Sequence, residues 1–314
     1  MSAFLDATDP TAPPAGLERP VVAIGNFDGL HRGHRAVLAR ARKLARALGR
    51  PCAALTFEPH PADFFAKRPV VFRLTPRAEK AVELAALGLD GMIALTFDER
   101  LARLSAEEFV TEILVGRLAV AGVVVGYDFH FGARRQGTPD FLRQAGARHG
   151  FAVEIVERIA ADDDGALESV SSTATRAALE VGDVRRAADL LGRPWRVSGE
   201  VVHGRKMGRQ LGFPTANIAL DPSCRLRHGV YAVRVGFDGA SVAGVASFGS
   251  RPMFDNGPPL LEIFLFDFSG DLYGRTLTVD FVDFIRDEAK FDSVEALVER
   301  MHEDVRVAKE ALAH

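Results

Sequence analysis

The sequence has few cysteines and no long apolar run, and each scarcity excludes a class of protein. Only Cys52 and Cys224 occur among 314 residues, and they fall in different halves of the chain. A disulfide framework or a zinc site made of cysteines is therefore excluded. No apolar run approaches the roughly 18 residues that a membrane helix needs. We expect a protein of the reducing cytoplasm that does not enter a membrane.

The sequence also lacks an excess of charge of either sign. The net charge is −3, with 26% charged and 47% hydrophobic residues, as in ordinary soluble proteins. This balance predicts no bulk electrostatic attraction to nucleic acid or to a membrane surface. Residues 1–19 lack the basic start and apolar core of a secretion signal, and we expect a disordered tail there. No feature fixes an oligomeric state, so an oligomer stays open.

The chain is long enough for two domains, because a single hydrophobic core usually stops growing below this length. From residue 21 to about 189, short strand-like runs alternate with helical runs. That order predicts a Rossmann-like α/β domain, with a parallel sheet covered by helices on both faces. Beyond residue 195 the strand-like runs follow one another without long helices, which predicts a closed antiparallel β-barrel. We place the first domain at 20–185 and the second at 186–314.

The predicted elements can be stated by residue number. In the first domain we expect strands at 21–27, 52–57, 91–97, 120–126 and 151–156, and helices at 33–48, 76–87, 105–114 and 140–149. In the second we expect strands at 195–202, 229–237, 242–248, 260–268 and 276–284, and a terminal helix at 293–312 that packs on the barrel.

The turn at 25–34 is the most informative segment, because it joins an apolar strand to a helical run. Its glycines allow a close approach of the backbone to a ligand, and the start of the following helix favours an anion. His31 and His34 can donate hydrogen bonds to the charge that builds up on a phosphoryl group during its transfer. The alternative is that both histidines are surface residues beside an ordinary turn.

Several motifs in one order give the chain a family resemblance. The turn resembles the His-x-Gly-His signature of nucleotidyltransferases, and its Gly-Asn-Phe-Asp-Gly start resembles bacterial FAD synthetases. Segments 56–61, 125–132 and 170–176 follow in the order of that family, and segment 208–217 is similar to the signature of riboflavin kinases. Together they resemble the bifunctional bacterial riboflavin kinase/FAD synthetase family.

For the first half, the resemblance implies a site that joins ATP to FMN. His31, His34 and Arg176 would act on the phosphates, and His60 would contact FMN. The remaining residues of the implied site are Gly25, Asn26, Phe27, Asp28 and Gly33 around the ATP phosphates, Ser171, Ser172 and Thr173 at a helix start, and Asp128 and Phe129 on the flavin or adenine side. The alternatives are an ordinary helix cap for 171–173 and a loop histidine without function for His60.

For the second half, the resemblance implies transfer of phosphate from ATP to riboflavin. Glu262 would be the base, Thr215 and Asn217 would hold Mg²⁺ through oxygen atoms, and Arg286 would contact the flavin. The residues expected near the phosphates are Gly204, Lys206, Gly208, Arg209 and Pro214. The alternatives are a solvated basic loop and a glutamate that faces outward on an alternating strand.

Four positions depart from the family pattern: Thr175 replaces isoleucine, His130 often arginine, Met253 threonine and Phe264 histidine. The expected function is phosphorylation of riboflavin to FMN by ATP, then adenylation of FMN to FAD with release of pyrophosphate. Both steps would use Mg²⁺, and the expected partners are the small molecules riboflavin, FMN and ATP. Two alternatives stay open, another nucleotidyltransferase and a catalytically impaired flavin-binding homologue.

Overall fold

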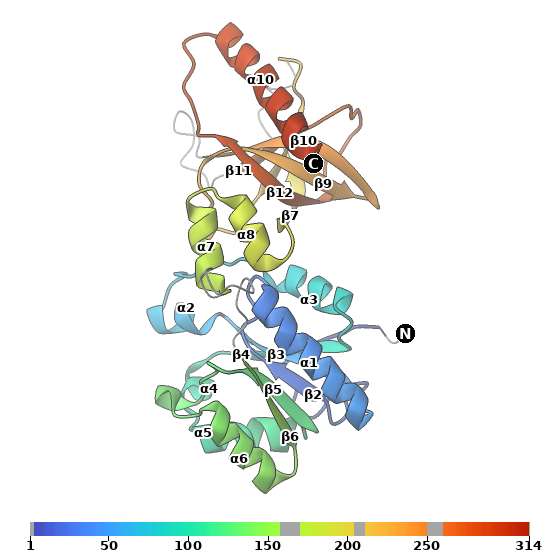
Figure 1. Cartoon of the computed structure of the whole chain (residues 1–314), viewed down its shortest axis with the longest axis vertical. Helices are drawn as coiled ribbons and strands as arrows, with labels where there is room; N and C mark the ends of the chain where they lie inside the picture. Colours follow the sequence, from blue (N-terminus) through green and yellow to red (C-terminus); the bar gives the residue numbers. More distant parts are fainter. Residues whose placement is uncertain (1–2, 158–169, 204–210, 250–259, 314) are drawn as a thin grey trace. The chain divides into compact units, whose positions relative to one another are not determined.

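The computed structural model of the chain describes residues 3–157, 170–203, 211–249 and 260–313 (Figure 1). Its contacts divide the chain into two compact units. The sheet unit comprises Met1–Val71 and Pro76–Val170, and the barrel unit comprises Phe72–Thr75 and Ser171–His314. The compact units divide between Val170 and Ser171, about 15 residues before the predicted domain boundary. The predicted domains at 20–185 and 186–314 are defined by activity and remain predictions.

The described strands of the sheet unit form one parallel sheet in the order β1-β4-β3-β2-β5-β6. The strands are β1 (Leu5–Thr8), β2 (Val21–Ile24), β3 (Cys52–Glu58), β4 (Gly91–Thr96), β5 (Gly122–Gly126) and β6 (Ala152–Val156). The helices are α1 (Arg32–Leu48), α2 (Pro61–Ala66), α3 (Arg77–Ala86), α4 (Glu99–Arg103), α5 (Ala106–Glu108), π-helical η1 (Phe109–Arg117), 3₁₀-helical η2 (Ala133–Arg135) and α6 (Pro139–His149). The predicted parallel sheet is confirmed.

Helices cover both faces of this sheet, because successive residues of a strand point to opposite sides. Val21 and Ala23 of β2 pack with α1 and α3 in one apolar cluster. Val22 and Ile24 pack in a second cluster with η1 and α6. A strand buried on both faces reads as a continuous apolar run, and all four residues of β2 are buried.

The expected disordered tail at 1–19 is corrected by the structure, which places β1 within it. Leu5 to Thr8 pair in parallel with β4, starting from Leu5 opposite Gly91. A side chain at Gly91 would place its Cβ 2.8 Å from the carbonyl oxygen of Leu5, so the close pairing requires glycine there. The four-residue strand was missed because it is short and because prolines and acidic residues lie in and after it.

The described strands of the barrel unit close in the order β10-β11-β8-β7-β12-β9, with every neighbouring pair antiparallel. The strands are β7 (Trp195–Val202), β8 (Thr215–Ala219), β9 (Gly229–Phe237), β10 (Ala240–Gly249), β11 (Leu260–Leu265) and β12 (Thr276–Arg286), and the helices are α7 (Ser172–Glu180), α8 (Val184–Leu191) and α10 (Val294–Leu312). The predicted barrel and terminal helix are confirmed. The sequence analysis missed β8, because Pro214 and two polar residues made it look like a loop.

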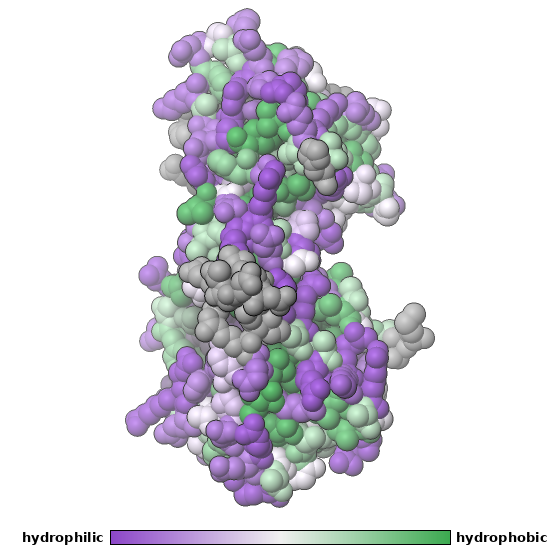
Figure 2. Space-filling model, in the orientation of Figure 1, coloured by the Kyte–Doolittle hydropathy of each residue, from purple (hydrophilic) through white to green (hydrophobic). Residues whose placement is uncertain are grey.

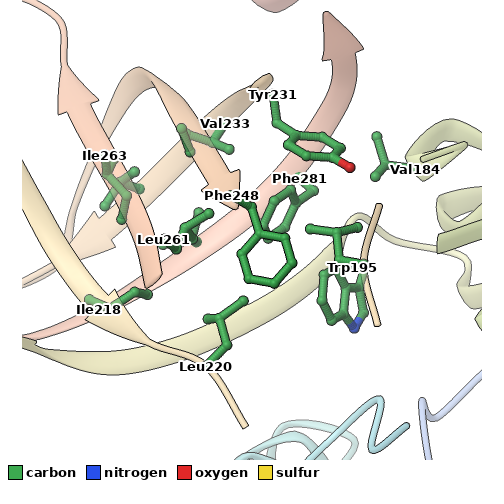
Figure 3. Close-up of a cluster of buried hydrophobic side chains, with 14 of the residues drawn as sticks. Val184, Trp195, Ile218, Leu220, Tyr231, Val233, Phe248, Leu261, Ile263 and Phe281 are labelled. Carbon is green, nitrogen blue, oxygen red and sulfur yellow. The ribbon is translucent and has the colours of Figure 1, made fainter. Parts of the chain in front are cut away.

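Figure 3 shows the apolar interior of the barrel unit, where aliphatic side chains from several strands surround Phe248 and Phe281. Trp195 is buried at the start of β7, and its Nε1 donates a hydrogen bond to the carbonyl oxygen of Leu74, 3.1 Å away. Phe72 also packs edge-on against Trp195. These contacts explain why Phe72–Thr75 belong to the barrel unit although the chain on both sides of them belongs to the sheet unit.

A buried ion pair fastens α10 to the barrel. The Nε and Nη2 atoms of Arg286 each donate to a carboxylate oxygen of Asp304, both at 2.7 Å. The two side chains are only 14% and 6% exposed. Such a bidentate pair fixes geometry as well as charge, and it sets the position of α10 against β12.

On the face that Figure 2 shows, apolar (green) and polar (purple) side chains of the described residues are interspersed. Within the described ranges, no helix combines the length and the apolar character needed to cross a membrane.

The thiol of Cys52 on β3 makes stability depend on pH. Burial, and secondly the charge of Asp90, raise its pKa from 9.0 to about 12. Above pH 9 the unfolded thiol loses its proton while the folded thiol keeps it. The folded state then binds more protons, and stability falls as pH rises toward 12.

We predict a free energy of unfolding that declines with pH above 9 by a contribution approaching about 1.4 kcal/mol per pH unit from this thiol. The measurement is urea unfolding of the wild type and Cys52→Ala between pH 8 and 11, followed by circular dichroism. The free energy of unfolding should fall less steeply with pH in the variant than in the wild type. Equal slopes of the free energy of unfolding against pH would contradict the prediction.

Candidate active sites

The turn after β2 has a backbone conformation that most residues avoid. Phe27 and Leu30 have φ values of 49° and 46°, and Gly29 has 89°. Left-handed conformations at residues other than glycine are costly and cluster at functional sites. Here they are stabilised by packing, because the side chains of Phe27 and Leu30 are buried in the cluster beneath α1.

Hydrogen bonds tie the start of this turn to β3. Gly25 N–H donates to the carbonyl oxygen of Leu55 at 3.1 Å, and Thr56 Oγ1 donates to the carbonyl oxygen of Asn26 at 3.2 Å. The side-chain amide of Asn26 lies 3.2 Å from Nε2 of His60. Asn26 is therefore held at its main chain and at its side chain.

His60 caps α2, and this role fixes its proton. Its Nδ1 accepts a hydrogen bond from Ala62 N–H at 3.2 Å, so in the neutral ring the proton is on Nε2. The amide atom of Asn26 at 3.2 Å is Nδ2, and since two donors cannot bond, we assign the amide turned by 180°, so that Oδ1 accepts this proton. The structure brings together Asn26 and His60, which the sequence analysis assigned to ATP and FMN respectively.

His31 and His34 form a stacked pair at the start of α1. His31 is the N-cap, and its Nδ1 accepts a hydrogen bond from His34 N–H at 3.2 Å. The ring centroids lie 3.6 Å apart with an angle of 18° between the planes. The pair therefore lies at the positive end of a 17-residue helix, which is a favourable place for an anionic group.

Gly33 leaves little space beside this pair. A Cβ at Gly33 would lie 3.2 Å from Cε1 and Nδ1 of the His31 ring. Asp28 is buried in the same turn. The predicted phosphate turn is thus a compact, preformed structure.

The second predicted motif, segment 125–132, follows β5 at the same edge of the sheet as the phosphate turn. β5 is parallel and adjacent to β2, so the loop with Asp128 and Phe129 starts beside the loop with the histidine pair. Asp128 and His130 are exposed, and His130 Nδ1 donates to the carbonyl oxygen of Asp128 at 2.9 Å. Phe129 stacks on Phe131 with centroids 5.5 Å apart. Both motifs therefore lie at the carboxyl ends of adjacent parallel strands, where ligands bind in open sheets of this kind.

The Ser171–Arg176 segment lies in the barrel unit. Ser171 is the N-cap of α7, and its side chain accepts from Ala174 N–H at 3.1 Å. Thr175, which replaces the usual isoleucine, is buried, and its hydroxyl donates to the carbonyl oxygen of Ser171. Arg176 Nε donates to the carbonyl oxygen of Phe72 at 2.7 Å. Ser171 therefore has a capping role, and the ATP contacts of Ser171, Ser172, Thr173 and Arg176 remain predictions.

On the barrel, Asn217 of β8 stands directly opposite Glu262 of β11. Their neighbours Ile218, Leu261 and Ile263 point into the barrel core, so Asn217 and Glu262 lie together on the outer face. Asn217 is only 5% exposed although it faces outward. Thr215 shares this face two residues earlier, opposite Phe264.

The residues beside this pair are braced by α10. Phe264 packs edge-on against Phe213, and Phe213 packs in the same way against His302 of α10. Pro214 follows Phe213 and is exposed. The aromatic contacts thus connect the terminal helix to the strand that carries Thr215 and Asn217.

Arg286 is engaged within the protein. Besides its bond to Asp304, its Nη1 donates to the carbonyl oxygen of Asp287 at 2.9 Å. A flavin contact of Arg286 remains a prediction, and its observed role is to hold α10. The predicted residues Gly204, Lys206, Gly208 and Arg209, and the departure at Met253, lie outside the described residues.

The sequence analysis missed one charged residue beneath the phosphate turn. Lys80 of α3 is 2% exposed, and its Nζ lies 3.1 Å from Glu58 Oε1. Lys80 stands in the polar run Arg77 to Lys80, where a lysine is usually solvated. Only the neighbouring motif at 56–61, which contains Glu58, pointed to this region.

These arrangements define a class of protein: a nucleotidyltransferase-type sheet unit in the same chain as a kinase-type barrel. A family model for FAD synthetase matches residues 14–174, and one for riboflavin kinase matches residues 191–312. The chain belongs to the bifunctional riboflavin kinase/FMN adenylyltransferase family.

Curated relatives of that name match nearly the whole chain. The relative from Pseudomonas fluorescens is 46% identical over 290 residues, and the match covers 92% of each chain. The relative from Escherichia coli K12 is 40% identical over 297 residues, with 94% of each chain covered.

A solved structure shares the whole fold. A chain described as a macrolide-efflux protein from Streptococcus pneumoniae has 32% identity and a TM-score of 0.84, and the match covers 98% of this chain and 99% of that one. That description names efflux, whereas the curated relatives are named as enzymes. The functional argument below rests on the family and on the residues of this chain.

Gly33→Ala tests the preformed histidine pair. The added methyl group must displace the His31 ring by a few tenths of an ångström. Misplacement of a positioned catalytic group on the scale of 1 Å can cost about a hundredfold in rate. We predict FAD formation from FMN that is about tenfold slower, measured by chromatography.

Alanine is a better helix former than glycine, so the melting temperature should not fall. FMN formation from riboflavin should also be unchanged. Wild-type FAD formation in this variant would contradict the assigned role of the pair.

Proposed function

We propose that the chain phosphorylates riboflavin to FMN at the outer face of the barrel and adenylates FMN to FAD at the carboxyl edge of the sheet. The observation that supports this most is that the stacked pair of His31 and His34 lies in the sheet unit, whereas the facing pair of Asn217 and Glu262 lies in the barrel unit. The matches to both family models, one for each half, argue against another nucleotidyltransferase.

In adenylyl transfer, a phosphate oxygen of FMN attacks the α-phosphorus of ATP, and the bond to the pyrophosphate oxygen breaks. No protein nucleophile is needed, so the protein contributes positioning and stabilisation of charge. His31 and His34 donate hydrogen bonds to the phosphate oxygens, and the start of α1 adds its N–H groups and dipole. Asn26, with Gly25, Phe27, Asp28 and Gly33, shapes the turn, and His60 contacts FMN. Asp128 and Phe129 line the flavin or adenine side.

In the kinase reaction, the terminal hydroxyl of the riboflavin side chain attacks the γ-phosphorus of ATP, and ADP leaves. Glu262 accepts the hydroxyl proton. Its position is fixed by the strand register opposite Asn217, and general base catalysis of this kind contributes typically 10² to 10⁴ in rate.

The residues present fit a magnesium ion. Thr215 and Asn217 offer a hydroxyl and an amide oxygen from one face of β8, and Mg²⁺ prefers oxygen ligands. In the described part of the chain, no group of three or more His, Cys, Asp or Glu could hold a metal. Mg²⁺ would therefore be held chiefly by ATP phosphates and water, with these side chains as its protein ligands. When bound, it neutralises phosphate charge.

We also place the reactions in the cytoplasm. Cys52 and Cys224 are both free thiols, and burial raises their pKa values to about 12 and about 11. Free cysteines are typical of a reducing compartment, and ATP is the co-substrate of both reactions.

Glu262→Gln separates the two activities. The amide keeps the size of the side chain but cannot accept the hydroxyl proton, so we predict FMN formation about 10² to 10⁴ times slower. FAD formation from supplied FMN should stay at the wild-type rate. The assay follows riboflavin, FMN and FAD by chromatography with ATP and Mg²⁺. Saturable flavin binding by the wild type without any product would instead identify an impaired flavin-binding homologue.

His31→Asn is the reciprocal variant. Asparagine is a good N-cap, so α1 should stay stable while the imidazole is lost. We predict FAD formation about a hundredfold slower, the typical cost of removing one donor to a developing charge, with FMN formation unchanged. His31→Ala and Arg176→Ala should show the same selectivity. Equal loss of both activities would contradict separate sites.

A further inference from the structure

Lys80 is a buried charge that the reactions above do not use. It lies on α3, and its side chain is 2% exposed. Lysine is almost never fully buried unless it is paired, because removing the ammonium group from water is costly. Its partners include Glu58 Oε1 at 3.1 Å and Thr56 Oγ1 at 3.4 Å.

The hydrogen-bond direction through Thr56 is fixed by chemistry. An ammonium group can only donate, so Thr56 Oγ1 accepts from Lys80. The single hydroxyl proton of Thr56 then points to the carbonyl oxygen of Asn26, 3.2 Å away. Lys80 thus donates the first of two successive hydrogen bonds, and the second ends on the backbone of the phosphate turn. In a buried setting, the hydrogen bonds of such a chain polarise and strengthen one another.

Glu58 provides a second route from Lys80 to the same turn. Glu58 is the last residue of β3, and two residues later His60 faces the side chain of Asn26. The ion pair with Lys80 therefore holds the strand end that positions His60. Both routes converge on Asn26, one on its carbonyl group and one on its side-chain amide.

We propose that Lys80 is a positioning residue for adenylyl transfer, which acts through Thr56 and Glu58 to hold Asn26 and the turn at 25–34 in the geometry that the reaction needs. The inference rests on the proposed function of the sheet unit. A fixed turn matters most in the transition state, so its loosening lowers kcat more than it raises KM for ATP.

Thr56→Val separates positioning from simple stabilisation. Valine has the size of threonine and leaves the Lys80–Glu58 pair in place, but it cannot pass a hydrogen bond to Asn26. We expect kcat for FAD formation to fall about tenfold or more, with KM for ATP changed less. Thr56→Ser, which keeps the hydroxyl, should recover most of the rate.

Lys80→Met, which keeps the length of the side chain without its charge, should lower kcat at least as much as Thr56→Val. The double variant should be little worse than Lys80→Met alone, because both substitutions break one chain. The folding control is Leu118→Ala at the end of η1. Leu118 is fully buried in the cluster of η1 and α6, which does not include Phe27 or Leu30, so its loss should lower the melting temperature and leave kcat of the folded protein unchanged.

The experiment uses the full chain with FMN, ATP and Mg²⁺ at a temperature well below each variant's melting transition. FMN formation from riboflavin serves as an internal control, because none of the substituted residues lies in the barrel unit. Wild-type kcat in Thr56→Val would overturn the proposal, as would a Lys80→Met variant that behaves like Leu118→Ala. If Lys80→Met does not fold, the comparison of Thr56→Val with Thr56→Ser decides. Absence of FAD formation by the wild type would instead refute the proposed function.

Discussion

The burial of Phe27 and Leu30 is the interaction on which the adenylyl site depends. Each residue has a left-handed backbone that costs about 1 to 3 kcal/mol, and the fold keeps it because each side chain is buried beneath α1. Full burial of a side chain of this size contributes about 1.5 to 3 kcal/mol, which is enough to offset the strain. The turn therefore places His31 at the start of α1, where its ring stacks on that of His34.

The barrel site depends on a different constraint, the register of two strands. Asn217 and Glu262 face each other because β8 and β11 pair in one register, and a slip of either strand by one residue would turn its own polar side chain into the core. The apolar residues at the intervening positions, such as Ile218 and Ile263, prevent that slip. One site is therefore held by packing of a turn, and the other by the alternation of apolar and polar residues along strands.

The sequence predicted those parts of the fold that have a strong pattern. The apolar run of β2, the helical run of α1 and the strand β7 were found because periodicity and glycine turns mark them. β1 and β8 were missed, since each is short and surrounded by proline or polar residues. Short segments such as β1 and β8 become strands because they pair with a neighbouring strand, and this pairing cannot be read from a single sequence.

The site residues were predictable only where they belong to a motif. His31, His34 and Glu262 were found in this way, and the structure adds what holds them. Lys80 was missed because a lysine in a polar helix looks solvated, and its burial follows from how α3 packs on the sheet. The contacts of Arg286 with Asp304 and of Arg176 with Phe72 likewise join residues far apart in the chain.

The most direct test of two separate nucleotide sites is a crystal structure of the full chain with a non-hydrolysable ATP analogue and Mg²⁺. The account predicts two bound triphosphates. One would lie within hydrogen-bond distance of His31 and His34, and the other beside Thr215 and Asn217. Triphosphates that lie away from both pairs would contradict the account.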